Sequence, residues 1–193
     1  MARALVVIDV QEEYFTGALR IFHPDPHISL SNIQRAMEAA AGTGVPVVLV
    51  RHTGIPEEGV FVPGTPGWDL RWEVAERPHD LLLDKEQASA FHGTDLAGWL
   101  AERSIDTVTL AGYMTQHCVD STSRHAGILG LYPEILSDAT GTLAFRTPAG
   151  QVTAEELHRA TLVAQSIGFA QILTTEQWVE LVRSAPQTSQ STV

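Results

Sequence analysis

The 193-residue sequence is poor in cysteine, and Cys118 is the only one. A lone cysteine forms no internal disulfide. Because there is no Cys-x-x-Cys pair, a thioredoxin-type redox site and a cysteine-rich zinc site are both excluded. Basic residues are also scarce, with 12 Lys and Arg against 23 Asp and Glu and a net charge of -11. A nucleic-acid-binding protein usually carries a basic stripe, so no nucleic acid partner is expected.

Long hydrophobic runs are missing too, so no segment is expected to span a membrane and no membrane partner is predicted. The chain begins Met1-Ala2-Arg3 and enters a strand-like run at once, which is unlike a signal peptide. No glycine-rich phosphate loop joins a strand to a helix, so the sequence predicts no nucleotide cofactor. Together these absences predict a soluble, cytoplasmic protein.

The hydrophobic pattern alternates between strand-like and helical segments. Strand-like runs are expected at residues 4–9, 45–51, 80–84, 106–112, 132–137 and 169–174. Helical patterns occur near residues 29–41, 94–103, 117–130, 153–166 and 175–184. This alternation predicts an α/β fold with a mostly parallel, six-stranded sheet. The runs 45–50 and 81–83 lack polar alternation, as strands covered by helices on both faces do.

One domain is the expected organisation, because 193 residues with 44% hydrophobic content suffice for one substantial core. We place this domain at residues 1–185, followed by a mobile tail at 186–193 that is rich in Ser, Thr and Gln. The residues expected to begin or end helices are Ser29 or Ser31, Gly42, Thr94, and a capping box of Thr153 and Glu156.

Three chemically active side chains stand at or just beyond the ends of predicted strands. Asp9 ends the first strand, Lys85 follows the third, and Cys118 follows the fourth across a short turn. Ligands of open α/β sheets bind at the carboxyl ends of the strands, where helix starts direct free N–H groups at the site. We therefore expect these side chains to converge. Each also has an ordinary alternative role: Asp9 as a helix cap, Lys85 as a solvated charge, and Cys118 as a small buried hydrophobe.

Four motifs carry a resemblance to a known family. They read IDVQEEYF at residues 8–15, KEQASAF at 85–91, AGYMTQHCVDST at 111–122 and SDAT at 137–140. In this order they are similar to the motifs of the isochorismatase-like cysteine hydrolases, and the similarity covers nearly the whole chain. The resemblance implies a three-layer, Rossmann-like α/β/α sandwich and a catalytic triad of Asp9, Lys85 and Cys118. It also implies hydrolysis of amide-like bonds and a homo-oligomer, either a dimer or a tetramer.

The expected mechanism begins with the thiol of Cys118. A free cysteine titrates at about pH 8.5, and we expect Lys85 and the helix start to lower the pKa of Cys118. The resemblance makes Asp9 the general base, although the charges alone equally allow Lys85 as the proton carrier. The backbone N–H groups of Met114 and Cys118 are the candidate oxyanion hole. The resemblance also implies a cis peptide bond between Tyr113 and Met114.

Five residues are candidates for substrate binding: Gln11, Phe15, Trp68, Tyr113 and His117. Gln11 and Phe15 resemble positions that line the family's pocket, although Gln11 is also suited to satisfying the backbone of a loop. Trp68 lies in a long irregular stretch from His52 to about Glu76. Long loops are often functional, so this one either covers the site with aromatic walls or packs locally or across a dimer.

Three histidines lie near the predicted site. His117 is not expected to act as a base on Cys118, because neighbours on a helix point in different directions. A pocket or interface role is expected for His117 instead. His52 and His92 are secondary candidates at the rim of the pocket.

A metal site is considered at His23, Asp25 and His27, which lie close together in the sequence. Some nicotinamidases of the resembling family carry a metal on an Asp and two histidines that follow the second strand. That region here reads RHTGIPE at residues 51–57, so we predict no metal and do not favour nicotinamide as the substrate. The three residues are interpreted as loop residues.

The predicted function is hydrolysis of a C–N bond of a small molecule, without a cofactor and through a Cys118 thioester. The bond is an amide, carbamoyl, ureido or lactam bond. One alternative is vinyl-ether hydrolysis of the isochorismatase type, which depends on the acid and needs no thiol. Another is a non-catalytic role, either as an oligomeric scaffold or as a redox sensor that uses Cys118.

Overall fold

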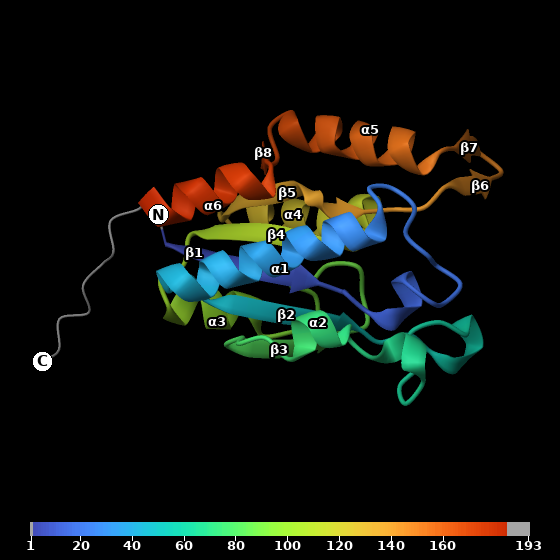
Figure 1. Cartoon of the computed structure of the whole chain (residues 1–193), viewed down its shortest axis with the longest axis horizontal. Helices are drawn as coiled ribbons and strands as arrows, with labels where there is room; N and C mark the ends of the chain where they lie inside the picture. The colour runs from blue at the N-terminus through green and yellow to red at the C-terminus, as the bar shows by residue number, and fades with distance from the viewer. Residues whose placement is uncertain (1, 185–193) are drawn as a thin grey trace, which may run out of the picture.

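A computed structural model describes residues 2–184, and its central element is a sheet of six strands (Figure 1). The strands are β1 (Arg3–Ile8), β2 (Val47–His52), β3 (Leu81–Lys85), β4 (Thr107–Tyr113), β5 (Tyr132–Gly141) and β8 (Gln171–Leu173). Their order is β3-β2-β1-β4-β5-β8, and every neighbouring pair is parallel. The α/β class and the six-stranded sheet expected from the hydrophobic pattern are confirmed.

Helices cover both faces of the sheet (Figure 1). They are α1 (Pro26–Thr43), α2 (Trp72–Ala75), α3 (Leu96–Glu102), α4 (Asp120–Ile128), α5 (Ala154–Ser166) and α6 (Thr175–Ser184). Successive side chains of a strand point to opposite faces. Accordingly, Leu5 and Val7 of β1 belong to a hydrophobic cluster with α1 and α6, whereas Val6 and Ile8 belong to a second cluster with α3 and α4. This arrangement is the three-layer α/β/α sandwich that the resemblance implied.

α1 extends beyond its predicted limits at both ends. It begins at Pro26, where the Asp25 carboxylate accepts a hydrogen bond of 2.8 Å from a backbone N–H of the first turn. Its last residue is Thr43, and the next residue, Gly44, has a φ of 73°, which is in the left-handed region. Proline at the first helical position and glycine after the last are the stronger signals. The predicted boundaries at Ser29, Ser31 and Gly42 are therefore wrong.

Other local expectations have mixed outcomes. The capping box of Thr153 and Glu156 is confirmed at the start of α5, and the Thr94 hydroxyl accepts a hydrogen bond from the N–H of Leu96 at the start of α3. An antiparallel hairpin of β6 (Phe145–Thr147) and β7 (Gly150–Val152) was not predicted, because strands of three residues are too short for a periodic signal.

Two further expectations concern the tail of the chain and the absence of membrane-spanning segments. The tail predicted at residues 186–193 lies outside the described residues. Of the helices within residues 2–184, none is both long enough and apolar enough to cross a membrane.

The segment after β4 forms a π-turn before α4 begins. Residues 117–130 were predicted as one helix, but Thr115–Val119 is a π-helical turn and α4 follows it. Single π-turns are rare and occur often at functional sites. Gly112 at the end of β4 has a φ of 108°, and a Cβ there would lie 1.9 Å from the carbonyl oxygen of Ile8. Glycine therefore allows the end of β4, and the π-turn after it, to lie close against the end of β1.

Candidate active site

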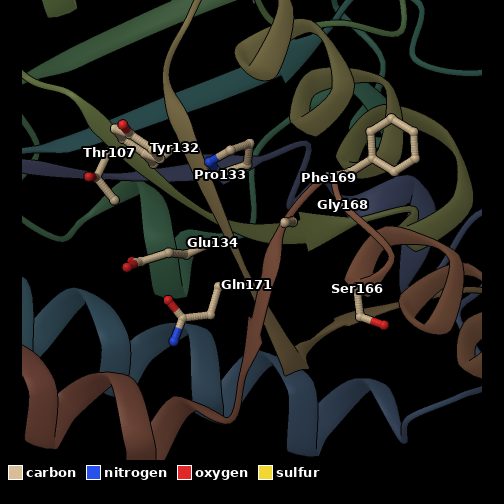
Figure 2. Close-up of a pocket in the computed structure, with 9 residues that line it drawn as sticks. Thr107, Tyr132, Pro133, Glu134, Ser166, Gly168, Phe169 and Gln171 are labelled. Atoms are coloured by element: carbon tan, nitrogen blue, oxygen red, sulfur yellow. The ribbon is translucent and has the colours of Figure 1, made fainter.

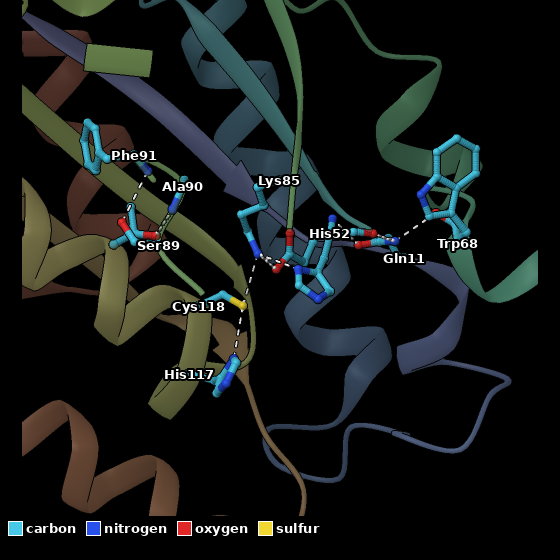
Figure 3. Close-up of polar contacts among 11 residues, drawn as sticks. Gln11, His52, Trp68, Lys85, Ser89, Ala90, Phe91, His117 and Cys118 are labelled. Carbon is cyan, nitrogen blue, oxygen red and sulfur yellow. Dashed lines mark hydrogen bonds and ion pairs between the residues drawn. The ribbon is translucent and has the colours of Figure 1, made fainter. Parts of the chain in front are cut away.

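Asp9, Lys85 and Cys118 lie together at the carboxyl edge of the sheet. Nζ of Lys85 is 2.8 Å from Oδ2 of Asp9 and 3.3 Å from Sγ of Cys118 (Figure 3). The three residues are 0%, 2% and 2% exposed, respectively. Asp9 directly follows β1, Lys85 ends β3, and Cys118 lies in the π-turn after β4. The parallel sheet thus brings together the three side chains that the sequence singles out.

Lys85 has a third contact that was not predicted. Nδ1 of His52, at the end of β2, lies 3.2 Å from Nζ of Lys85 (Figure 3). Burial and the Lys85 charge lower the pKa of His52 from its ordinary value, so the neutral ring accepts a hydrogen bond from the ammonium. The ammonium of Lys85 thus forms hydrogen bonds with His52 and Cys118 and an ion pair with Asp9. The register of the sheet produces this contact, because His52 pairs with Lys85 across β2 and β3, and the sequence carries no signal for that pairing.

The charge of Lys85 is maintained by its neighbours. Burial lowers the pKa of Lys85, but Asp9 and Cys118 outweigh burial and raise that pKa above its ordinary value. Lys85 is therefore an ammonium at neutral pH and has no lone pair with which to accept a proton.

The expectation that the pKa of Cys118 is lowered is wrong. Burial and the Asp9 carboxylate raise the pKa of the Cys118 thiol, and Lys85 only partly opposes them. The positive charge of Lys85 is already balanced by Asp9, so a thiolate would add a second buried negative charge to the site. The thiol therefore keeps its proton at neutral pH and needs a base at the moment of attack.

Asp9 is suited to be that base. Both carboxylate oxygens of Asp9 are buried and lack a hydrogen-bond partner among residues 2–184, and Oδ2 forms the ion pair with Lys85. A buried acceptor without a donor is costly. Interaction with the Asp9 carboxylate is also one of the causes that hold the proton on Cys118. The site therefore places an unsatisfied acceptor beside a protonated thiol.

The backbone before the π-turn has the geometry that the resemblance implied. The peptide bond between Tyr113 and Met114 is cis, although no proline follows it. The Met114 carbonyl oxygen accepts hydrogen bonds from the N–H groups of His117 and Val119 at 3.0 and 3.3 Å. The two N–H groups predicted as oxyanion donors, those of Met114 and Cys118, belong to this segment.

The structure shows Gln11 in its alternative role in a loop, and its predicted contact with the substrate stays a prediction. Nε2 of Gln11 donates to the carbonyl oxygens of His52 and Trp68 at 2.9 and 2.8 Å, and Oε1 accepts from the N–H of His52 at 2.8 Å. The residue is fully buried. Gln11 thus ties the loop after β2 to the end of β1, as Figure 3 shows.

The aromatic candidates pack mainly against other protein groups. The Trp68 indole donates to the Thr53 hydroxyl at 3.1 Å, and the Arg51 guanidinium lies 3.5 Å from its ring centre, which favours the local-packing interpretation of the loop. Tyr113 is fully buried, and its hydroxyl lies 2.8 Å from that of Ser29. Its predicted contact with the substrate stays a prediction. Half-buried Phe15 packs edge-on against Tyr113 at 5.8 Å.

His117 reaches Cys118, contrary to the expectation that neighbours on a helix diverge. Its Nδ1 lies 3.3 Å from Sγ of Cys118, and the side chain is exposed (Figure 3). The π-turn changes the angle between successive side chains, which the expectation for a regular helix did not include. His92, the other secondary candidate, is exposed.

Two of the three residues considered for a metal, His23 and Asp25, have other contacts. His23 packs edge-on against His158 with a ring separation of 5.4 Å, and Asp25 caps α1. In the part of the chain that the structure describes, no group of three or more His, Cys, Asp or Glu side chains is arranged to hold a metal ion.

A pocket of about 380 Å³ lies at the opposite edge of the sheet (Figure 2). Thr107, Tyr132 and Gln171 line it, and they are the first residues of β4, β5 and β8. Its carboxylate, Glu134, is buried and already bonded to Arg3 and to Thr109. This pocket is therefore separate from the group around Cys118.

Comparisons with known proteins agree with this geometry. A family model described as the isochorismatase domain matches residues 3–177. YddQ from Bacillus subtilis, an isochorismatase family protein, is 30% identical over 93% of this chain and 100% of its own length. A crystal structure of a candidate isochorismatase from Burkholderia xenovorans is 48% identical, with a TM-score of 0.93 over 94% of this chain and 88% of that chain.

Some relatives are named for a reaction at a C–N bond. Ureidoacrylate amidohydrolase RutB from Methylobacterium radiotolerans is 27% identical over 82% of this chain and 70% of its own length. N-carbamoylsarcosine amidase from Thermoplasma acidophilum is 25% identical, with a TM-score of 0.73 over 91% of this chain and 98% of that chain. Relatives of this chain thus include amidohydrolases.

Proposed function

The chain belongs to the isochorismatase family of hydrolases, and on this premise we propose that it cleaves a C–N bond of a small molecule through a thioester on Cys118. The scissile group is an amide, carbamoyl, ureido or lactam group. The contact of Lys85 with both Asp9 and Cys118, at 2.8 and 3.3 Å, is the observation that carries the proposal. A buried thiol and a buried carboxylate that both contact one ammonium have the composition of a nucleophile, its base and a charge that balances both.

Acylation is the first half of the proposed reaction. Asp9 takes the thiol proton while Sγ of Cys118 forms a bond to the carbonyl carbon, so negative charge moves from Asp9 to the substrate oxygen. Backbone N–H groups of Met114 and Cys118 stabilise that oxyanion. As the C–N bond breaks, the nitrogen takes the proton from Asp9 and the amine leaves. Lys85 stays an ammonium throughout and balances whichever group is negative.

Deacylation regenerates the thiol. Asp9 takes a proton from a water molecule, whose oxygen attacks the thioester carbon, and the C–S bond breaks as Cys118 recovers its proton. We assign the proton transfers to Asp9 and not to Lys85 because the raised pKa of Lys85 keeps it protonated. The sequence alone left open whether Asp9 or Lys85 carries the proton.

A panel of small substrates tests the proposal. We expect release of ammonia or an amine from at least one primary amide, N-carbamoyl, ureido or lactam compound, and no hydrolysis of an isochorismate-type vinyl ether. The acyl chemistry uses the thiol, whereas acid-dependent vinyl-ether cleavage does not. Release of product is measured by a coupled ammonia assay and by mass spectrometry. The proposal would be contradicted if the protein cleaved only the vinyl ether and a Cys118→Ala variant did so at the wild-type rate.

A further inference from the structure

The π-turn that carries Cys118 is tied to α5 by one buried pair of side chains. Thr115, the first residue of the turn, is 1% exposed, and its hydroxyl lies 2.8 Å from Nδ1 of His158. His158 belongs to α5, and its Nε2 lies 3.0 Å from the carbonyl oxygen of Ser137 on β5. The imidazole therefore bridges the π-turn and the neighbouring strand.

The partners of His158 determine which nitrogen carries its proton. A carbonyl oxygen only accepts, so Nε2 of His158 donates to Ser137. In a neutral ring Nδ1 is then an acceptor, and the Thr115 hydroxyl donates to it. Burial and the nearby His23 lower the pKa of His158 to about 4, so the ring is neutral at physiological pH. The orientation of the Thr115 hydroxyl is thereby determined.

We propose that His158 is a positioning residue for the nucleophile. It acts through Thr115: by holding that side chain in one rotamer, it holds the backbone at the start of the π-turn. The π-turn then keeps Sγ of Cys118 at 3.3 Å from Lys85 and directs the N–H groups of Met114 and Cys118 at the proposed oxyanion. This inference rests on the proposed function, in which Cys118 is the nucleophile. Misplacing such a group by about 1 Å can cost about 100-fold in rate.

Two substitutions separate the two hydrogen bonds of His158. The amide of asparagine lies near the position of Nδ1, so His158→Asn keeps an acceptor for Thr115 and loses the bond to Ser137. The amide of glutamine lies near the position of Nε2, so His158→Gln keeps the bond to Ser137 and loses the one to Thr115. Both variants remove one hydrogen bond from the same buried place, which makes them matched controls for stability.

The readouts are kcat, KM, melting temperature and the rate at which iodoacetamide alkylates Cys118, the only thiol. We expect His158→Gln to lower kcat and the alkylation rate by about tenfold or more, with KM within about twofold of wild type. His158→Asn should stay within about threefold of wild type in both rates. Thr115→Val should match His158→Gln, and the two together should add no further loss.

Equal losses in the Asn and Gln variants, in proportion to their melting temperatures, would overturn the inference, because His158 would then only support the fold. Unchanged alkylation in both His158→Gln and Thr115→Val would overturn it as well. Alkylation needs no substrate, so it separates this inference from the proposed function. If wild type hydrolyses no compound but the alkylation pattern holds, the proposed function fails and the positioning role stands.

Discussion

Replacing Cys118 by alanine is expected to abolish hydrolysis of every C–N substrate that the wild-type protein cleaves. The loss should be about 10⁴-fold or more, the scale seen when the nucleophile of a catalytic triad is removed. Cys118→Ser should fail almost as completely, because a hydroxyl is a much weaker acid than a thiol and a carboxylate is a poor base for activating it. The measurement is kcat on the best substrate of the panel.

A matched control separates loss of chemistry from loss of stability. Val108 is fully buried near the start of β4, at the edge opposite to Cys118. Val108→Ala should lower the free energy of unfolding by about 1–3 kcal/mol, at least as much as Cys118→Ala, yet keep kcat within about twofold of wild type. If Cys118→Ala retains more than a few per cent of wild-type turnover, Cys118 is not the nucleophile.

Breaking the ion pair of Lys85 and Asp9 is the second change with a large expected effect. Lys85→Met leaves the Asp9 carboxylate buried without its cation, and such a loss costs about 3–5 kcal/mol of folding free energy. Turnover should also be lost, because no charge then balances the oxyanion or the carboxylate. Denaturant unfolding at neutral pH, followed by circular dichroism, measures the free energy.

The double variant distinguishes the ion pair from two independent contributions. Asp9 has a φ of 51°, and asparagine tolerates that left-handed conformation, so Asp9→Asn is the compatible partner change. With both charges removed, we expect the variant with Asp9→Asn and Lys85→Met to be more stable than Lys85→Met alone, and still inactive. If the two single losses simply add in the double variant, the pair is not coupled as the 2.8 Å contact requires.

Much of the fold was predictable because its signals are local. All six strands were located from hydrophobic runs, and β1, β2 and β4 are largely buried as expected for covered parallel strands. The expectation that residues 81–83 are covered on both faces is wrong, because β3 is an edge strand in which Leu82 is 42% exposed. The order of Asp9, Lys85 and Cys118 along the chain was enough to expect their convergence, since parallel strand ends share one edge. The capping box at Thr153 was equally local.

The features that were missed depend on tertiary packing. The contact between His52 and Lys85 follows from the register of β2 and β3, and the bond between His158 and Thr115 from the docking of α5. No spacing rule encodes either. The pKa of Cys118 was predicted in the wrong direction because the expected effect of Lys85 was considered without the burial that accompanies it.

The π-turn explains why the expectation for His117 was wrong. A regular helix from residue 117 would have separated His117 from Cys118, whereas the π-turn brings them to 3.3 Å. Gln11 and Tyr113 match motif positions, but the Gln11 side chain is hydrogen-bonded to the backbone at the end of β2. The Tyr113 hydroxyl is hydrogen-bonded to that of Ser29. Motif similarity thus predicted the convergence of Asp9, Lys85 and Cys118 at the sheet edge, but not the contacts that Gln11 and Tyr113 make with other protein groups.

The most direct test of the account is the intact mass of the protein during turnover, after rapid acid quenching. We predict a mass increase equal to the acyl part of the substrate, on the peptide that contains Cys118, which disappears as the substrate is exhausted. Asp9→Asn should form little of this adduct. Steady hydrolysis without any adduct on Cys118, at a rate that Cys118→Ser leaves unchanged, would contradict the thioester mechanism.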